Sequence, residues 1–353
     1  GLTSKAGSSA PSAGASAGGK AELTFVNWSG DEEKAAFDAV IAAFEQANPD
    51  ITIKTDTVPY ASVQTNLDTR FQAGNPPDLF RVSYIDMGQY TSQDVLLDLS
   101  ASLDANAFEP GLFSAVVANG KPYGAPHQID TTAILYRKDA FEAAGLTAPT
   151  TLEEAWTWEQ FTAASNKLAK ITKKGQSPFI YDWQSAGAYR WLTWLFEAGG
   201  ALLGPDLKSA AIDSDAGRKA MDFTKSFFTN GWVAKNSSVK STTYPDSAFE
   251  SGTVAMAFAG SFLVPGIDTG VKKKFEYGAM PQPRDVAAST DLGGNAVVAP
   301  KNGKNTAAAT TFLQYLVSED AMRTYCQATN ELPTLKSLTS SQLDFAIRPD
   351  LMA

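Results

Sequence analysis

The sequence predicts an α/β protein built from two lobes. Its 353 residues are long for one compact domain, so we expect two lobes that each have a core of their own. Residues 22–85 alternate between strand-like and helix-like patterns, which is typical of an α/β lobe with a largely parallel sheet. The middle of the chain is rich in helical patterns, which indicates the second lobe.

The first lobe contains three predicted strands. ELTFVNW is rich in apolar residues, ITIKTDTVPY alternates with a period of two, and LFRVSYI is a further apolar run. We therefore expect strands at 22–28, 51–60 and 79–85. Helices are expected between them, because Phe37 opens a helically spaced apolar set and residues 61–73 follow a helical pattern.

Polar residues follow each of these strands. The stretch from Ser29 to Glu32 has the S-x-x-E form of a capping box, so we expect it to begin the first helix. In sheets of parallel strands, ligands bind outside the carboxyl ends of the strands. The sequence therefore places Trp28–Asp31, Tyr60 and Ser83–Asp86 at a cleft.

The second lobe is predicted mainly from three helices, at 157–175, 188–200 and 215–230. Thr157 and Gln160 form a capping pair at the start of the first. The second is apolar nearly all round and ends at Gly-Gly, as helices often do. Toward the end of the chain we expect a strand at 293–300 and a helix that begins after Asn305.

Composition argues against several classes of partner. The net charge of −9 argues against a nucleic acid, because phosphate binding requires clustered Lys and Arg. One His and one Cys are too few for a zinc site, and a single Cys forms no internal disulfide. There is no Walker loop, G-x-G-x-x-G, G-x-S-x-G or H-E-x-x-H motif. We therefore expect no metal and no cofactor.

The only histidine, His127, is followed closely by Asp130, so a catalytic role has to be weighed. Its surroundings contain no nucleophile elbow. Ser237–Lys240 matches S-x-x-K, but the companion S-D-N and K-T-G elements are absent. The 38 acidic residues permit some pair for glycoside hydrolysis, yet the spacing nominates no two of them. We predict no catalytic residue.

Aromatic residues near polar turns favour sugar binding instead. Flat rings can cover the apolar C–H face of a pyranose, while Asp and Asn hydrogen-bond its hydroxyls. The alternative is that the tryptophans lie in the core. We favour that alternative for Trp194, which is three positions from Trp191 on an apolar helix. The aromatic candidates are Trp28, Tyr84, Trp183, Tyr189 and Trp191.

Several segments, in order and spacing, resemble the extracellular solute-binding proteins of ABC importers, specifically their maltose-binding-protein-like carbohydrate group. These segments are FQAGNPPDLF with VLLDLS downstream, GKPYGAPHQIDTTAILYRKDAFEAAGL, PTTLEEAWTWEQF, FESGTVAMAFAGSF, GGNAVVAPKNGKNTAAATTFLQYLVSEDAM and LPTLKSL. Relatives usually continue past the last segment with further helices. Only about fifteen residues follow it here, so we expect a truncated end.

The resemblance implies a type II-like periplasmic-binding-protein fold, with two discontinuous lobes, mostly parallel sheets and a hinge that the chain crosses repeatedly. The implied crossings lie at Asp130–Leu135, Gly294–Val297 and Val317–Ala321. The implied N-lobe is 21–130 with 297–317, and the implied C-lobe is 131–296 with 318–353. Closure around a ligand would produce the form that the permease recognises.

The resemblance also implies ligand-binding residues. Asp130 matches a hinge carboxylate that faces ligand, and Phe262 stands where the family usually has a stacking Trp, which puts stacking there in doubt. For His127, ligand contact and a structural hinge role both stay open. The predicted set is Trp28, Ser29, Asp31, Ser83, Tyr84, Asp86, His127, Asp130, Tyr189, Trp191, Phe262, Gly294 and Asn295.

We therefore expect a monomeric binding protein that takes a mono- or oligosaccharide in an interlobe cleft and delivers it to the permease subunits of an ABC importer. Residues 1–20 are expected to be a flexible lipoprotein-type linker, because 15 of the first 19 are Gly, Ser or Ala. The expected location is the outer face of the cytoplasmic membrane, or the periplasm. The alternatives are a polyol, phosphate ester or polyamine ligand, a sensor partner of a membrane receptor, and a polysaccharide-active enzyme.

Overall fold

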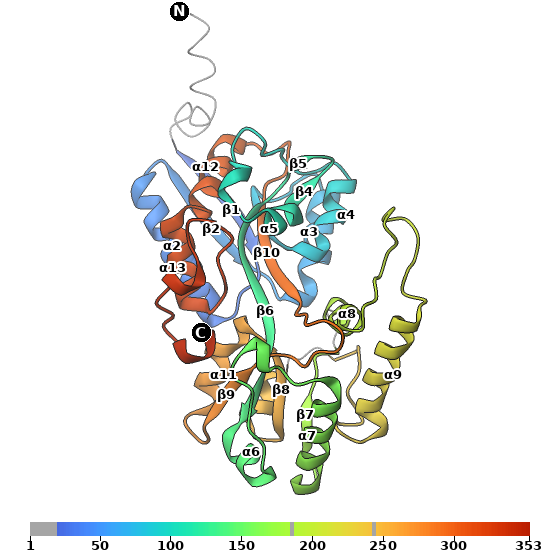
Figure 1. Cartoon of the computed structure of the whole chain (residues 1–353). Helices are drawn as coiled ribbons and strands as arrows, with labels where there is room; N and C mark the ends of the chain where they lie inside the picture. The colour runs from blue at the N-terminus through green and yellow to red at the C-terminus, as the bar shows by residue number, and fades with distance from the viewer. Residues whose placement is uncertain (1–19, 184–186, 242–244) are drawn as a thin grey trace, which may run out of the picture. The chain divides into compact units, whose positions relative to one another are not determined.

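The protein is described from a computed structural model, shown in Figure 1. The structure describes residues 20–183, 187–241 and 245–353, so the linker predicted at 1–20 lies outside the described residues except for Lys20. The chain forms two compact units. Unit 1 is Gly1–Asp130 with Gly293–Ala353, and unit 2 is Thr131–Leu292.

Unit 1 contains four neighbouring strands of the main sheet, in the order β2-β1-β3-β10. The strands β1 (Ala21–Asn27), β2 (Ile51–Thr57) and β3 (Leu79–Ser83) are parallel, as the strand-helix alternation predicts. The fourth strand, β10 (Leu292–Val298), returns antiparallel to β3. This pairing places Asn295 opposite Ser83, beside the carboxyl end of β3.

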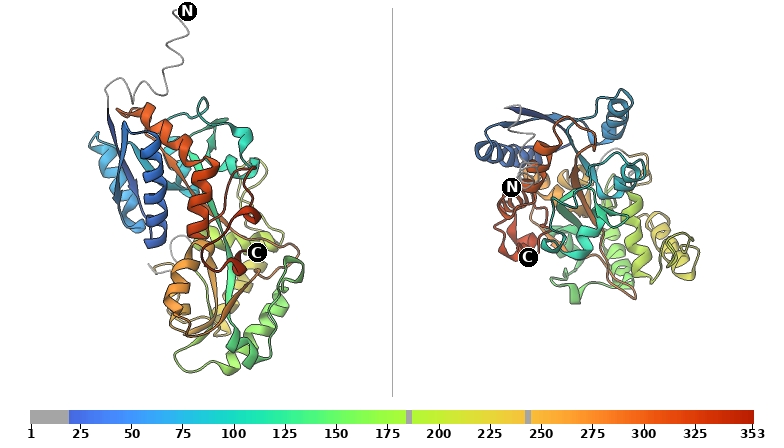
Figure 2. Two further views of the ribbon diagram at one scale, coloured as in Figure 1. Left: turned by 90° about the vertical axis from the view of Figure 1, so that its left-hand side faces the viewer. Right: turned by 90° about the horizontal axis from the view of Figure 1, so that it is seen from above.

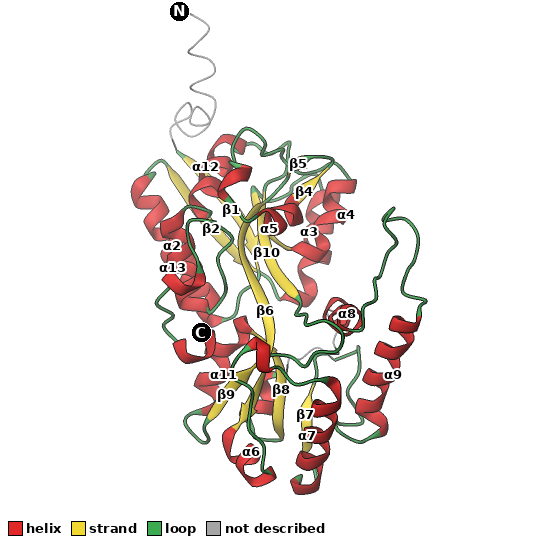
Figure 3. Ribbon diagram, in the orientation of Figure 1, coloured by secondary structure: helices red, strands yellow, loops and turns green. Residues whose placement is uncertain are grey.

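Helices cover this sheet (Figure 3). The five buried residues of α2 run from Ala36 to Phe44 at helical spacing and pack into the core, where Phe25 meets Phe37 with ring centroids 5.7 Å apart. The main helices are α2 (Asp31–Ala47), α3 (Val63–Gln72), α12 (Thr306–Leu316) and α13 (Glu319–Thr329). Shorter elements are α4 (Met87–Ser92), α5 (Pro110–Phe113), β4 (Val117–Ala118) and β5 (Lys121–Pro122).

The predicted capping box at the start of α2 is wrong. The N-cap residue is Gly30, and no side chain caps this helix. The Ser29 hydroxyl instead donates to the carbonyl oxygen of Trp28 at 2.6 Å. Ser29 therefore stabilises the turn after β1 rather than the helix, a local competition that is common for Ser near backbone carbonyls.

The predicted division of the C-terminal part between the lobes is also wrong. Residues 293–296 and 318–353 belong to unit 1, so the chain does not change units at Val317–Ala321. The α13 helix lies beside α2 (Figure 2), and Tyr325 donates to Glu33 at 3.1 Å. Leu332 pairs with Ile129 through backbone hydrogen bonds. These contacts hold the end of the chain to unit 1.

Unit 2 has a sheet in the order β9-β6-β8-β7. The long strand β6 (Ala125–Arg137) begins in unit 1 and continues into unit 2, where it is antiparallel to β8 (Val254–Gly260) and β9 (Tyr277–Met280). The fourth strand, β7 (Ser177–Ile180), runs parallel to β8. The helices are α6 (Lys138–Ala144), α7 (Trp158–Ile171), α8 (Gly187–Glu197), α9 (Asp215–Thr229), α10 (Asp246–Glu250) and α11 (Val264–Val271).

The core of unit 2 is dominated by aromatic rings. Trp194 is fully buried, with its ring centroid 5.6 Å from that of Phe227 and 5.7 Å from that of Phe258, so its predicted core position is confirmed. The capping box predicted from Thr157 and Gln160 is also confirmed at the start of α7. Both side chains accept hydrogen bonds from backbone N–H groups that the helix end leaves unpaired.

Candidate functional site

Several predicted site residues meet at the carboxyl edge of the unit 1 sheet. Trp28 follows β1, Tyr60 lies just beyond β2, and Ser83 ends β3. A small pocket opens between these strand ends and α3. Its lining residues are Trp28, Tyr60, Val63, Gln64, Leu67, Arg81, Val82, Ser83, Asp86 and Tyr90. The strand order therefore brings Trp28, Ser83 and Asp86 together, as the rule for parallel sheets predicts.

Two aromatic rings form one wall of this pocket. Trp28 and Tyr60 meet edge to face, with ring centroids 5.1 Å apart and an interplanar angle of 62°. Both side chains are half-buried. The Tyr60 hydroxyl lies 3.3 Å from the Ser83 hydroxyl, so the two strand ends are also joined by a polar contact. The result is an amphipathic surface with ring faces and hydroxyl groups side by side.

Asp86 supplies a carboxyl group to the same pocket. Burial raises its pKa, while a hydrogen bond with Gln64 acts in the opposite direction. The group is half-buried. An amide and a carboxyl side by side offer both donors and acceptors to a ligand hydroxyl.

Tyr84, Gly294 and Asn295 lie around Gln128. Tyr84 donates to the Gln128 carbonyl oxygen at 2.7 Å. Gly294 has φ +132°, and an added Cβ would lie 2.7 Å from that same oxygen and 2.8 Å from the Tyr84 ring. Only glycine fits there. Asn295 is buried and bridges Ser83, Gln128 and Gly294 when its amide nitrogen faces Ser83.

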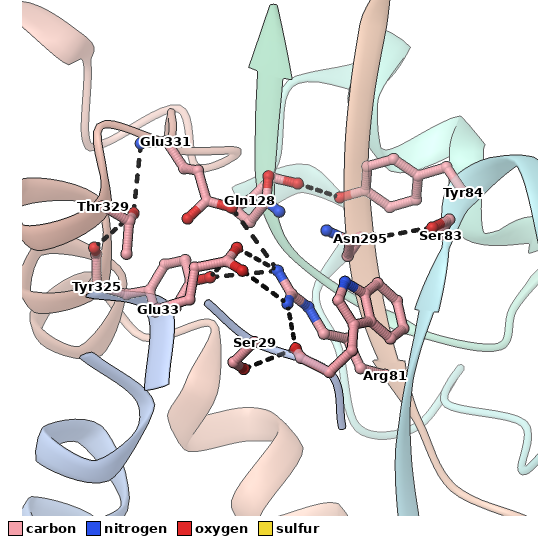
Figure 4. Close-up of polar contacts among 11 residues, drawn as sticks. Ser29, Glu33, Arg81, Ser83, Tyr84, Gln128, Asn295, Tyr325, Thr329 and Glu331 are labelled. Carbon is pink, nitrogen blue, oxygen red and sulfur yellow. Dashed lines mark hydrogen bonds and ion pairs between the residues drawn. The ribbon is translucent and has the colours of Figure 1, made fainter. Parts of the chain in front are cut away.

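A buried charged cluster is centred on Arg81, one of the residues that line the pocket (Figure 4). Arg81, which is not exposed at all, donates from both terminal nitrogens to the Glu33 carboxylate, at 2.9 and 3.4 Å. Glu331 is also fully buried, with Oε1 3.7 Å from Arg81 Nη2. Burial alone would raise the pKa of Glu33, but the charge and hydrogen bonds of Arg81 outweigh it and lower this pKa to about 2. For Glu331, burial and the Glu33 charge raise the pKa well above its usual range.

His127 does not line a ligand surface. It is 1% exposed and packs between the rings of Phe37 and Tyr325, at centroid distances of 5.3 and 5.0 Å. Burial, followed by the charge of Arg81, lowers its pKa well below the usual value, so the ring is neutral. Of the two roles left open for His127, this packing favours the structural one. Asp130 is buried at the end of unit 1, and Asp31 is exposed on the first turn of α2.

The remaining predicted residues, Tyr189, Trp191 and Phe262, belong to unit 2. Trp191 on α8 donates its indole N–H to Thr224 on α9 at 3.1 Å and packs against the aromatic core. The guanidinium of Arg190 lies 4.9 Å from the centre of the Tyr189 ring. The Phe262 ring lies against Gly260, where an added Cβ would be 2.4 Å from it.

Arg190 is itself buried within unit 2. It forms ion pairs with Asp182 at 3.1 Å and Asp291 at 2.8 Å, and it donates to the Thr132 hydroxyl at 2.8 Å. These contacts join α8 to β6 and to the segment before β10. A buried charge with this many partners serves to fix neighbouring segments.

The sequence analysis missed Gln64 and Arg81. A signal for Arg81 was present, because it is the one charged residue inside the apolar run LFRVSYI. A charge in such a strand requires a buried partner. Among the residues that the structure describes, no group of three His, Cys, Asp or Glu side chains is placed to hold a metal ion.

Comparison with known proteins identifies the family. The model of the bacterial extracellular solute-binding proteins matches residues 27–323, which is most of the chain. This chain is a bacterial extracellular solute-binding protein. Within its described parts, no helix combines the length and apolar character that crossing a membrane requires.

Relatives of this solute-binding protein are known in other bacteria. It is 25% identical over 311 residues to the maltooligosaccharide ABC transporter solute-binding lipoprotein of Streptococcus pneumoniae strain R6, covering 85% of this chain and 69% of that one. It is 26% identical over 310 residues to the maltodextrin-binding protein MdxE of Bacillus subtilis, covering 85% and 70%. The GacH receptor of Streptomyces glaucescens has the same fold, with a TM-score of 0.78, 23% identity and coverage of 90% and 81%. The predicted periplasmic-binding-protein fold is therefore confirmed.

Proposed function

We propose that this solute-binding protein binds a mono- or oligosaccharide and delivers it to the permease of an ABC importer. The observation that carries the proposal is the unit 1 pocket, where the Trp28 and Tyr60 rings stand beside Ser83, Gln64 and Asp86. Rings of this kind cover the C–H face of a pyranose, and the polar groups match its hydroxyls. The names of the maltooligosaccharide and maltodextrin relatives support the same ligand class.

The protein acts by recognition rather than by catalysis. Members of its family are solute-binding proteins, which supports the absence of an enzymatic step. The name of the pneumococcal relative supports a lipid-anchored form on the outer face of the membrane. We propose that this chain has the same anchoring and acts as a monomer.

Charge in the pocket argues against a phosphate-ester ligand. The only cation among its lining residues is Arg81, whose terminal nitrogens are already hydrogen-bonded to Glu33, to the Trp28 carbonyl and to Tyr325. An anionic ligand would have to displace these partners and would also meet Asp86. A neutral, hydroxyl-rich ligand fits the available groups better.

Isothermal titration calorimetry with maltooligosaccharides, galactooligosaccharides, glucose and galactose tests the proposal. At least one of these sugars should bind the intact protein. Trp28→Ala should weaken that binding by about 1–3 kcal/mol, because the stacked ring is lost. Tyr315→Ala is the matched control, since Tyr315 is a half-buried ring of unit 1 that packs on Phe44 outside the pocket.

The control should leave sugar affinity unchanged. Binding of spermidine or a glycerophosphodiester in place of every sugar would overturn the ligand class. Normal sugar binding by Trp28→Ala would remove the unit 1 pocket from the site.

A further inference from the structure

Arg81 occupies an unusual place for a charged residue. It lies on β3 next to Leu79, Phe80 and Val82, which are buried and apolar, and its own exposure is zero. Burying a charge is costly unless it is paired and hydrogen-bonded. The pair with Glu33 meets that cost. Arg81 also lines the pocket, which suggests a second role for its side chain.

Trp28 is held by Arg81 in two ways. Nη1 of Arg81 donates to the Trp28 carbonyl oxygen at 2.8 Å, which fixes the backbone where β1 ends. The guanidinium carbon also lies 4.7 Å from the centre of the Trp28 ring, within the range of a cation–π interaction. The hydrogen bond fixes the position of the Trp28 backbone, and the cation–π contact fixes the orientation of its ring.

Further contacts of Arg81 extend from the pocket to distant parts of the sequence. Nη2 donates to the Tyr325 hydroxyl at 3.2 Å and, with the Asn295 amide turned as above, to the Asn295 oxygen at 3.0 Å. One side chain therefore joins the turn after β1, the first helix, β10 and α13. Figure 4 shows Arg81, Glu33 and Tyr325 gathered around this point.

We propose that Arg81 is a positioning residue: its guanidinium, neutralised by Glu33, sets the orientation of the Trp28 ring that stacks on the ligand. This inference rests on the proposed function for the ligand itself. Arg81 does not contact the sugar, because its terminal nitrogens are used within the protein. It raises affinity by preorganisation, since a ring already oriented loses less conformational freedom on binding.

Lysine cannot replace arginine in this role. Its ammonium keeps the charge opposite Glu33, but it lacks the planar fork that reaches a carboxylate and a backbone carbonyl at once. A residue needed only for charge balance would accept Arg81→Lys, whereas a positioning residue would not. This difference separates the proposal from a purely structural role.

The test observes Trp28 directly. The intact protein is labelled with 5-fluorotryptophan, and the ¹⁹F resonance of Trp28 among the seven tryptophans is assigned with Trp28→Phe. In Arg81→Met/Glu33→Leu, which removes both charges together, the Trp28 resonance should shift or broaden while the other six stay in place. Affinity for the sugar bound by the wild type should fall about tenfold.

Arg81→Lys should remain folded, show the same displaced Trp28 resonance and fail to restore sugar affinity. Arg137→Met is the matched control, because Arg137 lies 4.2 Å over the Phe275 ring in unit 2 and so loses a similar contact away from the pocket. That control should change neither readout.

An unchanged Trp28 resonance in Arg81→Lys, with wild-type sugar affinity, would overturn the proposal. Arg81→Lys decides the matter even if the double variant does not fold. If the wild type binds no sugar, the proposed function fails, but the fluorine spectrum still decides whether Arg81 orients Trp28.

Discussion

The two units each bury one arginine against an aromatic ring, but they balance its charge differently. In unit 2, Arg190 lies over Tyr189 and forms ion pairs with two carboxylates, Asp182 and Asp291. In unit 1, Arg81 lies over Trp28 and is balanced by one ionised carboxylate, Glu33. Burial and the Glu33 charge raise the pKa of the second acid nearby, Glu331, well above its usual range, which favours its neutral form.

This difference has a physical consequence. If Arg190 is replaced by a neutral residue, Asp182 and Asp291 leave an unbalanced negative charge in the interior of unit 2. Around Arg81, the raised pKa of Glu331 limits that excess, while Tyr325 donates to Glu33 and Arg81 donates to the Trp28 carbonyl oxygen. Arg190 thus acts mainly as the counter-ion of Asp182 and Asp291, and it joins α8 to the segments that carry them. Arg81 can also orient a ring beside a pocket.

The largest expected effect is therefore in unit 2. Arg190→Met should destabilise the protein by about 3–5 kcal/mol, because two buried carboxylates lose their cation. Urea denaturation followed by far-ultraviolet circular dichroism measures this loss. Arg137→Met, at a partly exposed ion pair, should cost no more than about 1 kcal/mol. Equal losses for the two variants would contradict the role assigned to Arg190.

The two units can also be compared through the pH dependence of stability that their buried acids cause. Glu197 in unit 2 is fully buried and accepts a hydrogen bond from the Trp158 indole at 2.7 Å. Burial raises its pKa to about 9. Glu331 is shifted in the same direction, by burial and by the charge of Glu33. Above about pH 4.5 the unfolded chain releases these protons while the folded chain keeps them, so both acids lower stability as pH rises.

Glu197→Gln should therefore stabilise the protein, on the order of 2 kcal/mol at pH 8, with little gain at pH 4. Glu331→Gln should act in the same direction, with a slope of at most about 1.4 kcal/mol per pH unit. Glu33→Gln is the opposite case. The pKa of Glu33 is lowered to about 2, so its contribution is present above about pH 4.5 and is lost as pH falls toward 2.

Urea midpoints measured between pH 3 and 8 check all three variants. If Glu331→Gln loses stability relative to the wild type as pH rises, Glu331 is ionised in the folded protein, and Glu33 is not the only ionised partner of Arg81. If Glu331 is neutral, the stabilities of the wild type and Glu331→Gln should differ least near pH 4.

Much of the fold was predictable from local patterns. The strand-helix alternation gave β1 to β3 because apolar periodicity depends only on neighbouring residues, and the Thr157–Gln160 capping box follows from a four-residue motif. The position of residues 318–353 was not predictable in this way. It depends on contacts such as Tyr325 with Glu33, which are separated by 292 positions in the sequence.

The candidate site was predictable in part for the same reason. Trp28 and Asp86 follow strand ends, Ser83 is the last residue of β3, and parallel strands bring such ends together. The role of His127 stayed open at the sequence level, because a sequence shows a polar residue near a cleft segment but not the Phe37 and Tyr325 rings that bury it. Arg81 was missed because its partners come from four separate segments of the chain.

The smallest expected effect on stability concerns Trp191, a ring of unit 2 that is held by a hydrogen bond to Thr224. Trp191 is fixed by its hydrogen bond to Thr224 and by packing on the core of unit 2. Trp191→Phe keeps most of the ring and should cost about 1 kcal/mol of stability, the usual loss for one hydrogen bond. Thr224→Val removes the same bond from the other side, and its cost should not add to that of Trp191→Phe.

The predicted ligand contact of Trp191 is tested with Trp191→Ala and Trp191→Phe. Trp191→Ala should weaken sugar binding by about 1–3 kcal/mol, while Trp191→Phe should retain most of the affinity because a stacking ring remains. If both variants bind sugar as the wild type does, Trp191 is a packing residue only. The two tryptophans would then have different roles. Arg81 orients the Trp28 ring for ligand binding, whereas the Thr224 hydroxyl holds the Trp191 ring for stability.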